Sequence, residues 1–199
     1  SFSTKGWHNN SFDEFCDIAV DLGFGGIELH NVNNRLFTDK DGAFHDYTAA
    51  ATVRRLYELK LSIPCIDTIC DPADKAKKEE SLEEINACID IAANLHIPYV
   101  RIRACGTKNP QEKTEAMAEI IAEVLPAAEK NGVTLLIETS GIYCDTARLR
   151  DLLDRFACDN LAALWDMYWP YFNIDEQPET TIKNLGAYIK HVHIKDAIK

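Results

Sequence analysis

The sequence predicts an α/β protein in which parallel strands form a (β/α)8 barrel. Strand patterns and helix patterns alternate along the 199 residues, and one strand with its helix takes up about 30 residues, the size of a βαβ unit. Such alternation is typical of a parallel sheet that helices cover. An open doubly wound sheet usually has a glycine-rich turn after its first strand, and this sequence has none. Ionisable residues stand at the end of every expected strand, as they do around the mouth of a barrel.

Seven segments have strand character, because apolar and polar residues alternate in them or apolar residues follow one another without a break. In chain order they cover residues 1–3, 26–30, 63–69, 99–103, 133–138, 161–166 and 189–196. Pro64 stands near the start of the third strand, where the loss of one backbone hydrogen bond is tolerated.

Six segments between these strands have apolar residues at helical spacing. They cover residues 12–22, 48–59, 75–95, 111–130, 146–156 and 178–185. The first begins after Ser11, a good N-cap residue, with Glu14 as its partner in a capping box, and it ends at Gly23. Asn131 and Gly132 form a C-terminal stop for the fourth.

Seven strands are one fewer than a closed barrel contains, and such barrels typically need about 250 residues. We therefore expect a single barrel domain over residues 1–199 that is truncated at both ends, with its eighth strand beyond Lys199. A complete open sheet of seven strands is the alternative. A chain that ended near Lys199 would expose strand edges, and a partner would have to cover them. The sequence leaves the oligomeric state open, and a homo-oligomer is compatible with it.

The composition excludes several kinds of partner. The formal net charge is −11 and the pI is near 5.0, so neither nucleic acid nor an anionic membrane surface is expected to bind. No apolar run approaches the roughly 20 residues that span a bilayer. The seven cysteines are scattered without zinc-finger spacing, which favours a reducing, cytoplasmic location.

The best candidates for chemistry lie at the ends of the last three strands. Glu138 follows five uncharged residues, and Asp166 stands among aromatic residues. In the last strand His191, His193 and Lys195 share one face, because alternate side chains of a strand point the same way. Burying such groups without partners costs several kcal/mol. A divalent cation is a common partner for two carboxylates and one imidazole.

Three segments resemble the xylose isomerase-like TIM barrel family, which contains isomerases and epimerases of sugars and sugar phosphates. They are Leu-Ile-Glu at 136–138, Leu-Trp-Asp at 164–166 and His-Val-His-Ile-Lys-Asp at 191–196. The resemblance implies one divalent metal ion, which is manganese, magnesium, cobalt or zinc, bound by Glu138, Asp166 and His193. The family's fourth ligand, a glutamate on strand eight, has no counterpart before Lys199.

By the same resemblance the chain is expected to be a sugar isomerase or epimerase. Such an enzyme moves a proton next to a carbonyl through an enediolate held on the metal. Glu138 would take the proton and Lys195 would hold the developing oxyanion, so these two are the expected catalytic residues. The expected substrate-binding residues are Glu28, His30, Arg103, Trp169 and Lys195.

Structural roles are open for several of these side chains. Glu28 and His30 could equally brace the mouth of the barrel, and His191 is expected to be a brace. Arg101 and Arg103 could pair with acids inside the barrel or hold an anionic substrate, and the structural role is slightly favoured.

Two other functions are compatible with the sequence. One is a lyase or dehydratase of the keto-inositol type on the same scaffold. The other is a non-catalytic barrel that binds a carbohydrate or a partner. Ketose 3-epimerases of the family usually have a histidine where this chain has Trp169. The pair Lys195-Asp196 is more similar to sugar-phosphate epimerases and inosose dehydratases.

Overall fold

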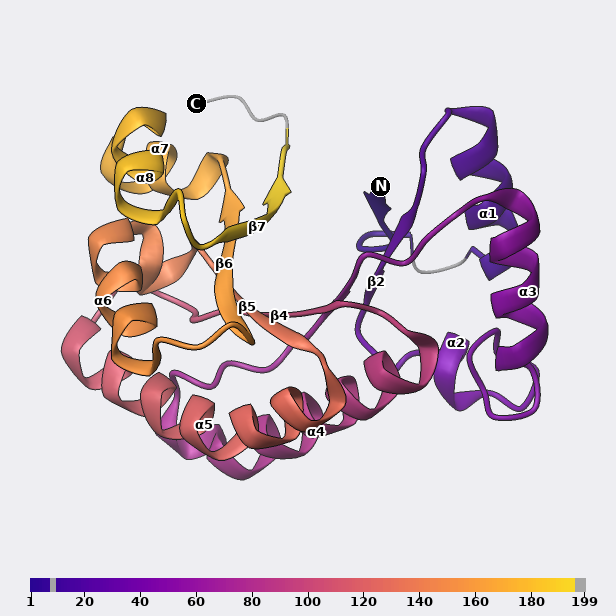
Figure 1. Ribbon diagram of the computed structural model, residues 1–199, viewed down its shortest axis with the longest axis horizontal. Helices are drawn as coiled ribbons and strands as arrows, with labels where there is room; N and C mark the ends of the chain where they lie inside the picture. The colour runs from indigo at the N-terminus through magenta and orange to yellow at the C-terminus, as the bar shows by residue number, and fades with distance from the viewer. Residues whose placement is uncertain (8–9, 196–199) are drawn as a thin grey trace.

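The computed structural model describes residues 1–7 and 10–195, and within this part seven strands form one parallel sheet. Each strand pairs with the next one along the chain, so the strand order never reverses. Figure 1 shows that the sheet curls and that the helices lie on its outer side. The predicted fold of the (β/α)8 barrel type is thereby confirmed. The strands are β1 (Phe2–Ser3), β2 (Ile27–His30), β3 (Cys65–Asp67), β4 (Tyr99–Ile102), β5 (Thr134–Glu138), β6 (Leu161–Asp166) and β7 (Ile189–His193).

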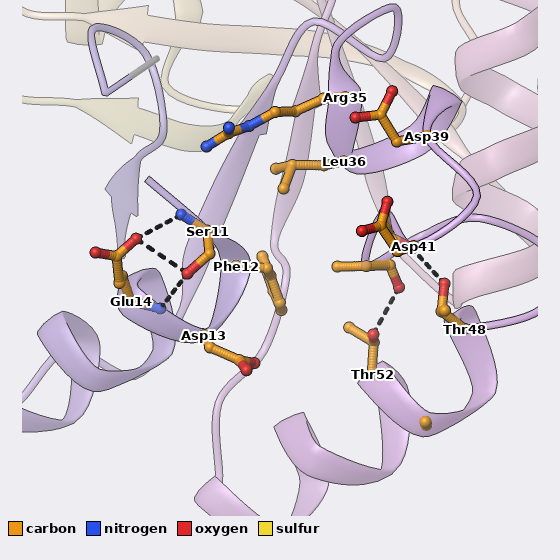
Figure 2. Close-up of a pocket in the computed structure, with 13 residues that line it drawn as sticks. Ser11, Phe12, Asp13, Glu14, Arg35, Leu36, Asp39, Asp41, Thr48 and Thr52 are labelled. Atoms are coloured by element: carbon orange, nitrogen blue, oxygen red, sulfur yellow. Dashed lines mark hydrogen bonds between the residues drawn. The ribbon is translucent and has the colours of Figure 1, made fainter. Parts of the chain in front are cut away.

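Six helices correspond to the helices that the sequence predicts. They are α1 (Phe12–Asp21), α3 (Ala49–Leu59), α4 (Lys78–Leu95), α5 (Pro110–Asn131), α6 (Thr146–Phe156) and α8 (Pro178–Leu185). The predicted capping box of α1 is present (Figure 2). The Glu14 N–H donates to Ser11 Oγ at 3.3 Å, and the Ser11 N–H donates to Glu14 Oε2 at 2.6 Å.

Three short helical segments were not predicted, namely α2 (Arg35–Thr38), α7 (Tyr168–Ile174) and the 3-10 helix η2 (Gly141–Cys144). The first three residues of the helix predicted over 75–95 form a 3-10 helix, η1 (Lys75–Lys77), directly before α4. The side chain of Asn34 caps α2 by accepting a hydrogen bond from the Leu36 N–H. Pro170 lies in the first turn of α7, where the N–H groups have no acceptor within the helix, so the missing N–H of proline costs no helical hydrogen bond. In the described part of the chain, no helix combines the length and apolar character needed to cross a membrane.

The inner face of the curled sheet carries a small apolar cluster made of Leu136, Ala162 and Leu164. Leu135, Ile137, Leu161 and Ala163, which alternate with them in β5 and β6, belong to the main core, because alternate side chains of a strand point to opposite faces. Glu138 and Asp166 lie two residues beyond Leu136 and Leu164, so they share the inner face. The same alternation therefore places both the apolar cluster and the two acidic side chains on the inner face.

Three strands end earlier than the sequence predicts. β3 ends at Asp67, β4 ends at Ile102 and β7 ends at His193. A strand continues only while a neighbour pairs with it, and the last pair between β6 and β7 joins Asp166 to His193. Arg103 and Lys195 therefore follow their strands. Asp196, the predicted end of the last strand, lies outside the described residues.

A buried ion pair joins β3 to β4 on the inner face. Arg101 Nε donates to Asp67 Oδ1 at 2.9 Å, and Arg101 Nη2 lies 2.7 Å from Asp67 Oδ2. Burial raises the pKa of Asp67, but the Arg101 guanidinium more than offsets this effect and holds the pKa well below its usual value. The prediction that Arg101 pairs with acids inside the barrel is confirmed.

Replacing Arg101 by methionine should lower the free energy of unfolding by about 3–5 kcal/mol, because Asp67 is left as a buried charge without its partner. Urea unfolding followed by circular dichroism measures this change. The double variant Arg101→Met/Asp67→Asn removes both charges and should recover most of the loss. Equal losses in the single and double variants would contradict the assignment.

Gly141 allows the segment after β5 to pack against the segment after β4. Its φ is +58°, and a Cβ there would overlap the carbonyl oxygen of Ala104. Gly132 has a similar φ of +66°, but nothing lies within 4 Å of a Cβ built on it. The two glycines therefore share backbone strain and differ in the space around them.

This difference predicts unequal effects of alanine. Gly132→Ala should lower the free energy of unfolding by about 1–2 kcal/mol through backbone strain. Gly141→Ala should cost roughly 1–3 kcal/mol more, because the two segments must move apart. Urea unfolding of both variants provides the comparison, and equal costs would show that Ala104 does not restrict the segment.

Candidate metal centre

Three candidate metal ligands end consecutive strands. The register pairs Asp166 of β6 with His193 of β7, and Glu138 of β5 with Leu164, two residues before Asp166. One donor atom from each of Glu138, Asp166 and His193 lies within 4.8 Å of the other two. The fold therefore brings together the set that the sequence predicts, and its role in metal binding stays a prediction.

The centre adjoins a cavity of about 700 Å³ on the inner face of the sheet. Residues from the carboxyl ends of several strands line it, among them Glu28, Arg101, Glu138 and His193. Its volume lies within the range of small-molecule sites.

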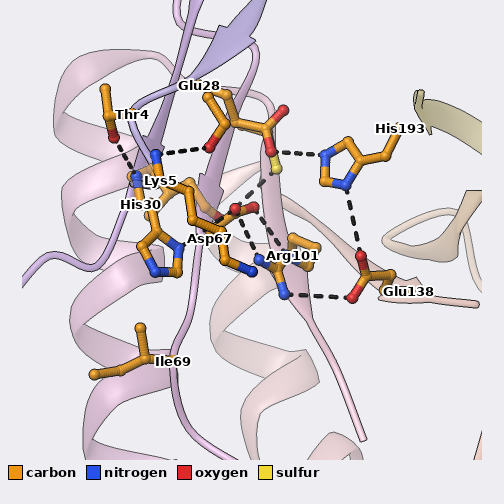
Figure 3. Close-up of polar contacts among 12 residues, drawn as sticks. Thr4, Lys5, Glu28, His30, Asp67, Ile69, Arg101, Glu138 and His193 are labelled. Atoms are coloured by element: carbon orange, nitrogen blue, oxygen red, sulfur yellow. Dashed lines mark hydrogen bonds and ion pairs between the residues drawn. The ribbon is translucent and has the colours of Figure 1, made fainter. Parts of the chain in front are cut away.

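The carboxylate of Glu28 holds both histidines of β7. Its Oε2 lies 2.8 Å from His191 Nε2. Its Oε1 lies 2.7 Å from His193 Nε2, and Figure 3 shows this second contact. Because Glu28 occupies Nε2, the Nδ1 atom of His193 is the nitrogen that faces Glu138, at 3.5 Å from Oε1. A carboxylate behind a histidine is a common way to orient a metal-binding ring. Glu28 is only 2% exposed, which favours this bracing position, and its predicted contact with substrate stays untested.

Glu138 lies among three groups that stabilise its ionised form. Ser140 Oγ donates to Glu138 Oε2 at 3.0 Å, Arg101 Nη1 is 3.4 Å from the same oxygen, and His193 contacts the other one. Burial raises the pKa of Glu138, but these partners outweigh burial and lower it to about 2. Burial likewise lowers the pKa of His193, whereas Glu138 and Glu28 raise it to about 10. In the metal-free state the two groups are therefore a carboxylate beside an imidazolium.

Asp166 is fully buried, and its two oxygens differ in their partners. Its Oδ1 accepts a hydrogen bond from the Tyr168 N–H at 3.0 Å. Its Oδ2 lies 2.5 Å from Lys195 Nζ but accepts no hydrogen bond of regular geometry from the described residues. Burial raises the pKa of Asp166 more than Lys195 lowers it. Lys195 Nζ also lies 4.7 Å from the centre of the Trp169 ring, so it connects a candidate ligand to a candidate sugar-stacking surface.

His30 and Arg103, also predicted to bind substrate, lie away from the three candidate ligands. His30 Nδ1 is 3.5 Å from Asp67 Oδ2, and the ring lines a separate cavity of about 130 Å³. Arg103 lines another cavity, of about 250 Å³, which it shares with Ser140 and Trp169. Their roles in substrate binding stay predictions.

Several contacts that hold the centre were not foreseen. They are the double contact of Glu28 with the histidines, the hydrogen bond from Ser140 to Glu138 and the choice of Asp67 as the partner of Arg101. Glu28, Asp67 and Arg101 stand at or near strand ends, and that position was a usable signal. Ser140 follows a strand end by two residues, and nothing in its local sequence distinguishes it.

Solved structures with the same fold include proteins with different names. The 3-keto-D-glucoside 4-epimerase YcjR from E. coli has a TM-score of 0.79 and 12% identity, over 98% of this chain and 78% of that chain. The probable 3-DHS dehydratase AsbF from Bacillus anthracis has a TM-score of 0.72 and 20% identity, over 98% of this chain and 72% of that chain. The IOLI protein with a bound zinc atom has a TM-score of 0.75 and 15% identity, also over 98% of this chain and 72% of that chain. At these identities the likeness concerns the fold.

The comparison with sequence families is more specific. No curated protein matches this chain in a sequence search. The family described as "Xylose isomerase-like TIM barrel" matches residues 16–199, which is most of the chain. The family match agrees with the parallel, curled sheet, and the chain belongs to the xylose isomerase-like TIM barrel family.

Proposed function

We propose that the protein is a divalent-metal-dependent isomerase or epimerase that acts on a sugar or a sugar derivative. The observation that carries this proposal is the meeting of Glu138, Asp166 and His193, whose donor atoms lie within 4.8 Å of one another. The epimerase YcjR and the zinc-bound IOLI protein have the same fold, which supports both the reaction class and the use of a metal.

The chemistry of the donors fits a divalent cation. Two carboxylates and one imidazole suit manganese, magnesium, cobalt or zinc. Four buried carboxylates here are contacted by two permanently charged cations, and a divalent ion would add positive charge where carboxylates predominate. The carboxylates are Glu28, Asp67, Glu138 and Asp166, and the cations are Arg101 and Lys195.

The surrounding side chains have suitable roles in proton transfer. A bound divalent cation would act as a Lewis acid toward the carbonyl oxygen of the substrate. Glu138 is ionised at neutral pH, because its pKa is about 2, and it can accept a proton from the carbon next to that carbonyl. The Lys195 ammonium group would stabilise the oxygen on which negative charge develops. Trp169, beside Lys195, would supply an apolar surface for the sugar ring.

The group that returns the proton is not assigned. In the family pattern a glutamate on strand eight is half of the acid–base pair, and residues 1–199 contain no counterpart to it. Proton removal is therefore a better test than complete epimerisation. A dehydratase on this scaffold would instead release water, and a non-catalytic barrel would leave the substrate unchanged.

The purified chain should bind one divalent ion, measured by elemental mass spectrometry and by calorimetric titration with Mn²⁺ and Zn²⁺. Glu28→Gln should weaken binding by roughly 10–100-fold, because the ring of His193 loses its orienting carboxylate. Glu138→Gln and His193→Ala should weaken it further, because each removes a donor atom.

Two control variants carry the same types of substitution, Glu→Gln and His→Ala, at residues outside the centre. Glu58→Gln changes an exposed residue of α3, and His45→Ala changes the loop before α3. Both should bind the metal as the wild type does. Wild-type protein that binds no divalent ion would refute the proposed function, and binding that survives Glu138→Gln and His193→Ala would refute the ligand set.

Proton removal should appear as deuterium uptake from D₂O next to the carbonyl of a ketose, measured by NMR with D-fructose and D-fructose 6-phosphate as probes. Lys195→Met should slow the uptake by about 10²–10³-fold, the usual effect of removing one group that stabilises a developing oxyanion. Lys190→Met, in the strand that precedes Lys195 but exposed to solvent, should leave the rate unchanged. Equal rates for Lys195→Met and Lys190→Met would exclude the role of Lys195, and water release would favour the dehydratase.

A further inference from the structure

A second cavity lies beside the metal centre, between the segments that follow β4 and β5 and helix α7. Its volume is about 250 Å³, and Arg103, Thr107, Ser140 and Trp169 are among the residues that line it. None of the described residues that line it carries a carboxylate. The cavity therefore has one fixed charge, the guanidinium of Arg103, together with hydroxyl groups and an indole ring.

Arg103 differs from Arg101 in how its charge is satisfied. Arg101 pairs with both Asp67 and Glu138. For Arg103, no ion pair or hydrogen bond with another described residue is found, and its Nε is buried without an acceptor. A buried donor without a partner costs free energy, and the cost is larger for a charged group. A ligand that brings acceptor oxygens would remove this cost.

A second cation near the mouth of the barrel, Lys5, also lacks an ion-pair partner among the described residues. Lys5 lines the large cavity, and its side chain extends toward Arg101 (Figure 3). Its pKa is lowered, first by burial and then by the charges of Arg101 and Arg103. Lys5 forms no ion pair with the described residues, so two cations near the mouth, Lys5 and Arg103, have no carboxylate of their own.

The cavity is contiguous with the candidate metal centre. Ser140, which lines it, donates to Glu138 Oε2 at 3.0 Å. Trp169, which also lines it, lies under Lys195, whose Nζ contacts Asp166. A small molecule whose reacting end lay at Glu138 could therefore extend its other end toward Arg103.

We propose that the cavity at Arg103 binds an anionic group of the substrate, a carboxylate or a phosphate. The proposal rests on the proposed function, because it assigns one end of the substrate of that same site, and it narrows the substrate class to sugar acids or sugar phosphates. Arginine suits this role because its planar donors match the oxygens of either group. The net charge of −11 repels anions at long range, so binding would have to come from these local contacts.

Calorimetric titration of the metal-loaded protein with three probes of similar size tests the proposal. D-Gluconate carries a carboxylate, D-glucose 6-phosphate carries a phosphate, and D-glucose is neutral. At least one anionic probe should bind ten times more tightly than D-glucose or better, and the stronger of the two identifies the group. Arg103→Met should reduce this preference to within about twofold. Arg54→Met, which removes an exposed arginine of α3, should leave it intact.

Two further measurements distinguish failure of the anion-binding proposal from misfolding of a variant and from failure of the proposed function. Arg103→Lys keeps the charge and should retain part of the preference, which shows that a loss in Arg103→Met is not caused by misfolding. Metal content of every sample tests the proposed function separately, since a chain without metal can still be titrated with the same probes. Equal binding of charged and neutral probes by the wild type, or a preference unchanged in Arg103→Met, would overturn the inference.

Discussion

The carboxylate of Glu28 connects β2, next to one edge of the curled sheet, with β7 at the other edge. It belongs to β2, and its oxygens contact His191 and His193 of β7, which are 163 and 165 residues further along the chain. Four strands lie between β2 and β7 in the sheet, so this contact exists only because the sheet curls. The contact also decides which nitrogen of His193 faces Glu138. The candidate centre is therefore a consequence of curvature, and its geometry depends on a residue that contributes no donor atom to the set Glu138, Asp166 and His193.

Charges alternate in sign along the buried polar groups of the inner face. Asp67 contacts Arg101, Arg101 contacts Glu138, Glu138 contacts His193 and His193 contacts Glu28. Buried ions are tolerated when each has a partner of opposite sign, and removing one leaves its neighbour uncompensated. In the proposed function a metal ion would take the place of the proton on His193 Nδ1, and the Glu28 contact would stay in place. Stability and the proposed metal binding would then depend on the same side chains.

Much of the fold follows from periodicity, because each strand places one row of apolar residues against the helices. The meeting of Glu138, Asp166 and His193 could be anticipated as well, since parallel strands bring their carboxyl ends to one edge. The short helices α2 and α7 could not, because four residues hold too little periodicity and α7 opens on Tyr-Trp-Pro, a weak helical sequence. The sequence also does not indicate that Arg101 and Arg103 have different surroundings. Alternation predicts both on one face, but β4 ends at Ile102, so Arg103 lies beyond the part of the chain in which the strand fixes the side-chain direction.

The same end of the barrel contains two regions of opposite character in a protein whose net charge is −11. Carboxylates predominate around the candidate metal ligands, whereas Arg103 and Lys5 form no ion pair with the described residues. Long-range repulsion of an anion is screened by salt, with a Debye length of about 8 Å at physiological ionic strength, whereas contacts inside a cavity are screened much less. Salt would therefore weaken the long-range repulsion of an anion by the net charge more than it weakens the attraction of the anion to Arg103. An anionic substrate of such a site would lose less affinity with rising ionic strength than a ligand held by an exposed basic patch, because its binding depends on a partly buried guanidinium rather than on the charge of the whole protein.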